Sequence, residues 1–184
     1  DSIEVKARRV STDAMKTGPT DPVDWPVEPD ASKPDVLAAQ PPLGLGVVAD
    51  GVAPVLLHLT RNSATDQAAT YEIQIKATSG DPGNLSSLDL ENTVRQRLRV
   101  RVNGQWASAE PALFTFAAGQ SNAFAYIEGI PMDKVPPRFP STVTINLMDG
   151  TNEVESTSFK VRRPPIVLVH GYNANETTWS AQFK

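Results

Sequence analysis

The residues that decide the fold read Tyr71-Glu72-Ile73-Gln74-Ile75-Lys76-Ala77. Apolar side chains occupy every second position, with polar side chains between them. Because successive side chains of a β-strand point to opposite faces, this pattern predicts a strand with one face in a core and the other in water. The next residues, Ser79-Gly80-Asp81-Pro82-Gly83-Asn84, are typical of a turn that ends the strand.

Further short strands are predicted before and after this one. The predicted runs are 45–49, 55–60, 94–102, a short run around Trp106, 113–116, 123–127, 142–148 and 156–161. Residues 85–93 are expected to form a polar loop anchored by Leu85, Leu88 and Leu90. Asn103-Gly104 is a strong hairpin signal, and no segment is interpreted as helical. Seven or eight strands separated by turns predict an all-β fold, an antiparallel β-sandwich over residues 43–163.

The run 94–102 carries four arginines at alternate positions. In a strand they share one face and form a basic stripe; they are Arg95, Arg97, Arg99 and Arg101. A basic stripe can bind a polyanionic glycan or nucleic acid, but the chain is acidic overall and no aromatic residues are interleaved. We therefore expect a solvated sheet face paired with nearby carboxylates, and no nucleic-acid partner.

One segment within the predicted domain resembles a known family. It reads Val48-Ala49-Asp50-Gly51-Val52-Ala53-Pro54-Val55-Leu56-Leu57-His58-Leu59-Thr60. It is similar to the start of bacterial immunoglobulin-like domains of the invasin and intimin kind, in which Ala-Asp-Gly precedes a strand with alternating apolar residues. Pro54 and His58 depart from the Thr-rich strand of that family. The resemblance implies an immunoglobulin-like sandwich.

The N-terminal region divides into two parts. Residues 1–10 alternate Ile3, Val5 and Ala7 with charged residues, which predicts a short strand at a sheet edge. Residues 11–42 contain seven prolines, which lack the N–H group that a helix or an inner strand requires. This stretch is interpreted as a linker or a strap on the surface. Trp25 within it is expected to pin the strap to a folded domain, the alternative being a partner that recognises Pro-rich segments.

The composition is that of a soluble globular protein. The 184 residues are 40% hydrophobic and 21% charged, with a net charge of −4 and a pI near 5.2. There are no cysteines, which removes disulfides, thiolate nucleophiles and Cys-ligated metals. No run approaches the ~20 apolar residues of a membrane helix. A secreted or cell-surface bacterial protein is expected, although a cytoplasmic protein can also lack Cys. The start at Asp1 is compatible with removal of a signal peptide.

Two groups of residues are candidate metal ligands. Asp81, Asn84, Asp89 and Glu91 supply oxygen donors within a short stretch, as calcium requires. Their spacing is not that of a calcium loop, so turn formation and solvation are preferred. The two histidines, His58 and His170, are far apart in the sequence, and His58 is expected to be structural. No metal and no cofactor are therefore predicted.

The C-terminal stretch carries the strongest chemical signal. It reads Pro164-Pro165-Ile166-Val167-Leu168-Val169-His170-Gly171-Tyr172-Asn173-Ala174-Asn175-Glu176-Thr177-Thr178-Trp179. The apolar run between Pro and His-Gly predicts a buried strand of a parallel sheet. Here the chain resembles the α/β-hydrolase family, in which an early strand ends in His-Gly and the next loop helps to form the oxyanion hole. The resemblance implies that Tyr172 supplies a backbone N–H group, Gly171 permits close approach and His170 braces the loop. Residues 164–184 would then be the truncated start of that domain.

No nucleophile accompanies this loop. Gly-x-Ser-x-Gly does not occur in the sequence, and the family places its catalytic triad after this strand. We therefore expect the chain to be the N-terminal part of an exported serine hydrolase, an esterase or lipase acting on carboxylic esters or lipids, and to be inactive alone. Its partner would be the rest of the hydrolase domain, in the same chain or in a companion chain. The alternative is a cell-surface adhesion or structural module, whose last residues are an edge strand and a polar tail. Lys184 is compatible with a trypsin-like cut, with natural processing or with an engineered end.

Overall fold

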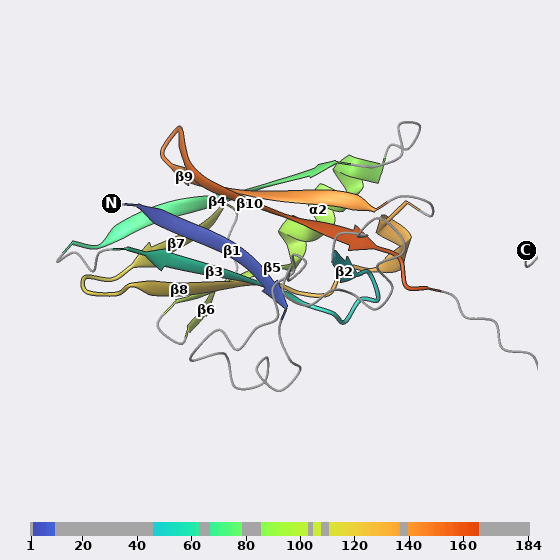
Figure 1. Cartoon of the computed structure of the whole chain (residues 1–184), viewed down its shortest axis with the longest axis horizontal. Coiled ribbons are helices and arrows are strands. Elements are labelled where there is room, and N and C mark those ends of the chain that lie inside the picture. Colours follow the sequence, from blue (N-terminus) through green and yellow to red (C-terminus); the bar gives the residue numbers. More distant parts are fainter. Residues whose placement is uncertain are drawn as a thin grey trace, which may run out of the picture.

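The protein is mostly β-structure, arranged in two five-stranded sheets (Figure 1). A computed structural model describes residues 2–9, 46–62, 67–78, 86–102, 105–107, 111–136 and 140–165. The first sheet has the order β1 (Ile3–Arg9), β3 (Val55–Arg61), β8 (Asn122–Ile127), β5 (Leu98–Val102), β6 (Gln105–Ala107). The second has the order β2 (Gly46–Val48), β10 (Asn152–Arg162), β9 (Ser141–Asp149), β4 (Ala69–Thr78), β7 (Ala112–Phe116). One α-helix, α2 (Ser86–Arg97), and a short 3-10 helix, η1 (Met132–Lys134), complete the described elements.

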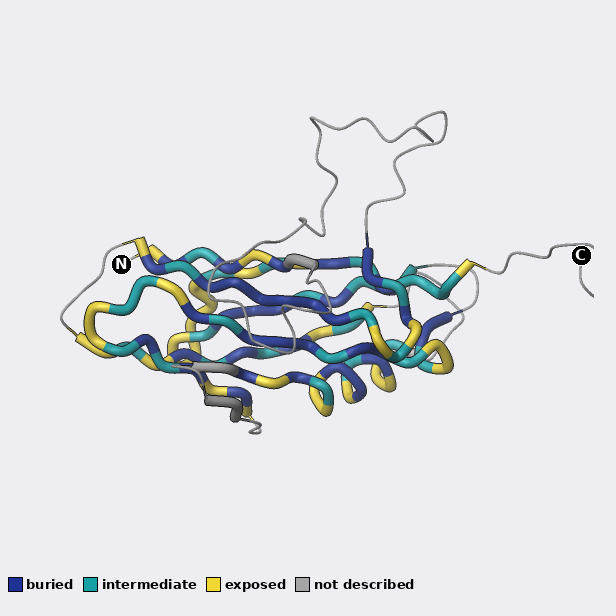
Figure 2. Tube along the Cα trace, turned by 90° about the horizontal axis from the view of Figure 1, so that it is seen from below, coloured by how far each residue is buried: buried dark blue, intermediate teal, exposed yellow. Residues whose placement is uncertain are grey.

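One hydrophobic core joins the two sheets, and buried positions run along the strands of both layers (Figure 2). The stretch 71–77 lies in β4, where Tyr71, Ile73 and Ile75 are buried, as their alternation predicts. Ile75 lies opposite Ile145 of β9, and Val143 of β9 lies opposite Phe159 of β10. Buried rows therefore continue across the sheet. The all-β prediction is confirmed at this level.

Most of the predicted pairings are present. β1 is an edge strand paired with β3, β5 pairs with β6 across Asn103-Gly104, and β9 pairs with β10. One pair departs from the antiparallel prediction, because β2 runs parallel to β10. The two strands lie far apart in the sequence, so no tight hairpin forces them to be antiparallel.

The prediction of a loop over 85–93 followed by a strand over 94–102 is wrong in its first part. Helix α2 extends from Ser86 to Arg97, and only Leu98–Val102 form a strand. Leu90 and Val94 are fully buried and lie four residues apart, which places them on one face of a helix. Leu88, expected to be an anchor, is 64% exposed. The apparent alternation of the arginines hid this helical spacing.

Several predictions fall on residues outside the described part of the chain. They concern the Pro-rich stretch 11–42 with Trp25, the anchor Leu85, and the apolar run with its His-Gly loop in 166–184. Among the described residues, no helix has the length and apolar character needed to cross a bilayer.

Candidate functional site

The Ala49-Asp50-Gly51 segment forms a tight turn that leads into β3. The Asp50 carboxylate oxygen Oδ1 accepts hydrogen bonds from the backbone N–H groups of Val52, at 2.8 Å, and Ala53, at 2.7 Å. The Ala53 bond, helped by that of Val52, lowers the pKa of Asp50 below its usual value, against an opposing effect of burial. Gly51 has a φ of 78°, a conformation that glycine adopts without steric cost. Each residue of the turn thus has a local structural reason.

This turn packs against the segment that follows β8. The Gly51 N–H group donates to the Ile130 carbonyl at 3.0 Å. A Cβ atom on Gly129 would overlap the backbone of Gly51 and Val52, so the two segments lie in direct contact. The Ala49 N–H group donates to the Arg162 carbonyl at 2.7 Å, which ties the turn to the last residue of β10. We call the turn 49–53, the segment 129–135 and residues 162–165 the junction end.

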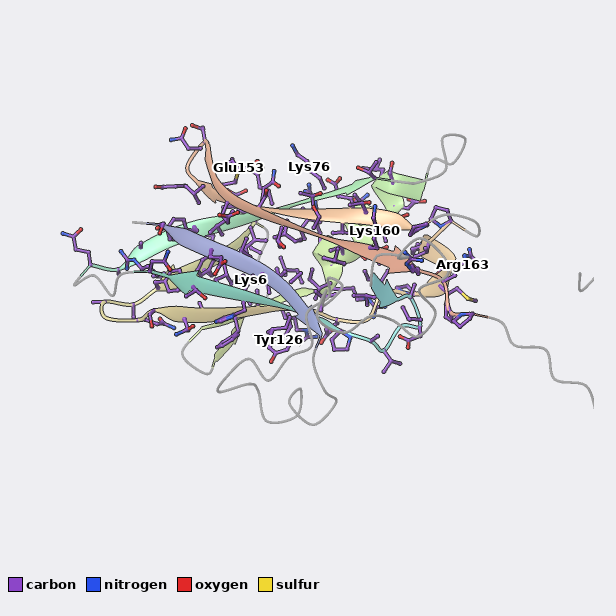
Figure 3. All side chains as sticks on the ribbon, viewed as in Figure 1. Lys6, Lys76, Tyr126, Glu153, Lys160 and Arg163 are labelled. Atoms are coloured by element: carbon purple, nitrogen blue, oxygen red, sulfur yellow. The ribbon has the colours of Figure 1, made fainter. Side chains whose placement is uncertain are left out.

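The chain leaves the described domain at the junction end (Figure 3). Arg163 Nε donates to the Val135 carbonyl at 2.6 Å, which fixes the residue after β10 to the segment 129–135. Pro164 and Pro165 follow, and their fixed φ angles stiffen the exit. Val52 and Met132, on the two contacting segments, are 66% and 47% exposed. The junction end therefore combines a rigid exit with exposed apolar side chains.

The residues expected to form the oxyanion loop come next in the sequence. His170, Gly171 and Tyr172 lie outside the described residues, five to seven positions after Pro165. The geometry of their backbone N–H groups therefore stays a prediction. The structure describes the platform from which that loop departs.

The predicted basic stripe does not exist as a strand face. Arg95 and Arg97 lie on α2, whereas Arg99 and Arg101 lie on β5. Arg99 Nε pairs with Glu128 Oε1 at 2.9 Å. Arg95 Nη2 pairs with Glu91 Oε1 at 2.6 Å and donates to the Ile75 carbonyl at 3.3 Å. The expectation that these arginines pair with nearby carboxylates holds for Arg95 and Arg99.

Glu91 and Arg95 together serve the edge of β4. β7 pairs with β4 only as far as Ile73, opposite Ala112. Beyond that point, Glu91 Oε2 accepts from the Ala77 N–H group at 3.2 Å, while Arg95 donates to the Ile75 carbonyl. Two side chains of α2 thus bond backbone groups that a neighbouring strand would otherwise satisfy. Sequence analysis missed this role, although the four-residue spacing of Glu91 and Arg95 was visible.

A small cavity of about 240 Å³ lies beside this edge. Its lining comprises Glu72, Ile73, Gln74, Ile75, Arg95, Leu98, Pro111 and Ala112. The guanidinium group of Arg95 is already engaged by Glu91 and by the Ile75 carbonyl. The cavity therefore presents no free catalytic group.

The candidate metal ligands are not assembled as a site in the described residues. Asp89 and Glu91 lie on α2, and Asp81 and Asn84 fall outside the described part. His58 is 8% exposed, its Nε2 lies 2.8 Å from Asn122 Oδ1, and its ring stacks on Phe124 at 5.0 Å. This packing gives His58 a structural role. Within the described segments, no three His, Asp or Glu side chains converge as a metal would require.

No protein-family model matches the chain, and no curated protein matches its sequence. Its function is therefore inferred from its own residues and their geometry.

Proposed function

We propose that the chain is the N-terminal part of an exported bacterial serine hydrolase, an esterase or lipase that acts on carboxylic esters. The two-sheet domain would be a non-catalytic spacer or substrate-positioning module of immunoglobulin-like topology. The hydrolase domain would begin after the junction end, at Ile166.

The strand order supports the immunoglobulin-like assignment. The β1-β3-β8-β5 sheet corresponds to the A-B-E-D order of that fold, and the β10-β9-β4 strands correspond to G-F-C. β7 extends the second sheet beside β4, as a C′ strand does. Here β5 precedes β7 in the sequence, with α2 before it, which is a departure from the usual strand order.

The observation that carries the proposal is the anchored exit of the chain. Arg162 and Arg163 are hydrogen-bonded to two separate segments of the domain, and two prolines follow. This arrangement suits a module that holds a following domain in a fixed direction, because a flexible linker would have neither feature. The next residues are the apolar run and the His-Gly pair that resemble the hydrolase family.

The proposed chemistry uses the loop after this run. In acyl transfer the carbonyl oxygen gains negative charge, and a backbone N–H group held in place stabilises it by roughly 3 kcal/mol. Tyr172 would supply that N–H group, Gly171 would admit the substrate oxygen, and His170 would brace the loop. The nucleophile would come from sequence beyond Lys184.

The reading frame beyond Lys184 tests this proposal directly. We expect a further strand followed by Gly-x-Ser-x-Gly within roughly 60 to 120 residues. A continuation into another Ala-Asp-Gly sandwich repeat would instead establish the alternative, a cell-surface adhesion or structural module without catalysis.

Ester hydrolysis provides the biochemical test. The 184-residue chain is expected to cleave no short-chain nitrophenyl ester above the blank, because it lacks a nucleophile. In the full-length protein, Gly171→Val is expected to lower kcat by about 100-fold by displacing the Tyr172 N–H group. The matched variant Val154→Ala, at an exposed position of β10, should leave kcat unchanged. A fully active Gly171→Val enzyme would remove the oxyanion role from this loop.

A further inference from the structure

Two fully buried side chains lie on the wrong face of the first sheet for the shared core. In β3 and β8, the core receives Leu57, Leu59, Ala125 and Ile127. Leu56 and Tyr126 occupy the alternate positions, are register partners, and are both 0% exposed. Neither belongs to the core cluster between the sheets. Figure 3 shows Tyr126 on the side of the first sheet that faces away from β9 and β10.

The outer face of the second sheet behaves differently. Lys76 and Ser158 are exposed, and Thr144 between them is half-buried. A bare sheet face therefore leaves outward side chains accessible in this protein. Full burial of Leu56 and Tyr126 requires a second apolar layer over the first sheet, because a side chain loses all contact with water only when atoms surround it.

The connection from β1 to β2 has the length and position to supply this layer. β1 ends at Arg9, opposite Val55, and β2 begins at Gly46, a few residues before the turn that leads into Val55. Both ends of the connection thus lie close to the start of β3, and a few residues would bridge them. Residues 10–45 far exceed that need, and the excess chain must lie somewhere on the surface.

The chemistry of the connection fits the face. Trp25 is its one aromatic residue, and an indole ring gains much on burial against apolar side chains. Its prolines favour an extended path without backbone N–H donors to satisfy. It carries six acidic and two basic residues, while Arg8 and Arg99 are the register partners that flank Leu56 and Tyr126. Charge complementarity therefore favours this segment over a basic or neutral one.

We propose that the Pro-rich segment 10–45 lies across the outer face of the first sheet and covers Leu56 and Tyr126, with Trp25 as its apolar anchor. The face is thus an intramolecular docking surface. It does not depend on the hydrolase assignment, since it concerns the two-sheet domain alone.

Tyrosine accessibility in the 184-residue chain tests the proposal. Nitration by tetranitromethane, mapped on peptides, is compared at Tyr126 and at Tyr71, which lies in the core between the sheets. Replacement of residues 12–43 by a short Gly-Ser linker is expected to raise the Tyr126 nitration rate at least about tenfold and leave Tyr71 protected. Trp25→Ala should give a smaller rise at Tyr126. The control Leu113→Ala, at an exposed position of β7, should change neither tyrosine.

Continued protection of Tyr126 in the folded linker variant would overturn the proposal and assign the covering layer to another part of the chain. If that variant does not fold, Trp25 reports instead. In the Trp106→Phe/Trp179→Phe chain, Trp25 is expected to be shielded from acrylamide several-fold relative to a free peptide of residues 10–45. Quenching equal to that of the peptide would also overturn the proposal.

Discussion

At the scale of single residues, Asp50 explains why Ala-Asp-Gly stands before β3. Its carboxylate accepts two backbone N–H groups of the turn, and Gly51 provides the positive φ that turns the chain. The motif is therefore intelligible as local backbone chemistry, whatever its ancestry. The same turn then contacts Ile130 and Arg162, so a local feature supports long-range contacts.

Asp50→Ala is expected to lower the free energy of unfolding by about 1 kcal/mol, because two turn N–H groups lose their acceptor. Denaturant unfolding monitored by circular dichroism measures the change. Asp50→Asn keeps an acceptor oxygen and should lose less; equal losses would show that the oxygen does not matter.

The pH dependence of stability follows from the lowered pKa of Asp50. Since the folded pKa lies below the usual value of 3.8, the contribution is fully present above that value and is lost as the pH falls through the folded pKa. NMR titration of the Asp50 carboxyl should give a midpoint below 3.8. In Asp50→Asn this part of the acid destabilisation should disappear. A midpoint at or above 3.8 would contradict the role of the two hydrogen bonds.

Gly129 tests how tightly the turn and the segment after β8 are packed. Gly129→Ala is expected to cost roughly 3 kcal/mol, because its Cβ would overlap the backbone of Gly51 and neither backbone can move freely. Gly119→Ala is the control: its φ of 74° is strained for alanine, but its Cβ would meet open space. The control should cost only about 1 kcal/mol. Equal losses of thermal stability would show that the contact at Gly129 is loose.

At the scale of elements, α2 shows how one strand edge is protected. The helix buries Leu90 and Val94 in the core and directs Glu91 and Arg95 to the backbone of β4. An exposed edge invites pairing with another chain, and these side chains occupy its hydrogen-bonding groups. The helix thus contributes to the core and to the edge at once.

Glu91→Ala is expected to speed hydrogen exchange at the Ala77 amide by about tenfold, since that N–H group loses its acceptor. The loss of stability should be about 1 kcal/mol. Asp89→Ala, at an exposed position on the same helix, is the control and should leave the Ala77 amide unchanged. Unchanged exchange in Glu91→Ala would mean that the edge is satisfied in another way.

At the scale of the whole molecule, β1 belongs to the same core as the domain that follows the long connection. Ile3, Val5 and Ala7 are buried, and β1 pairs with β3 over its full length. The N-terminal strand is therefore an integral layer element of the first sheet.

Val5→Ala is expected to lower the free energy of unfolding by about 2 kcal/mol through lost burial and the space left behind. Lys6→Ala, on the opposite face of the same strand and half exposed, should change it by less than about 0.5 kcal/mol. Thermal unfolding of both variants measures the difference. Equal effects would imply that β1 does not contribute to the core in solution.

The sequence by itself determined the β class and most strand positions, because period-2 alternation and turn residues are local signals. The stretch 71–77, the hairpin partner of Leu98–Val102 and the edge position of β1 were all readable in this way. Over 94–97 the same reasoning failed, because alternating arginines matched a strand while Leu90 and Val94 matched a helix. Only burial of those two residues against the sheets decided between them. The parallel β2–β10 pair, the cap of α2 on β4 and the anchored exit at Arg163 were likewise decided by tertiary structure, because each joins residues that are distant in sequence or leave no local pattern.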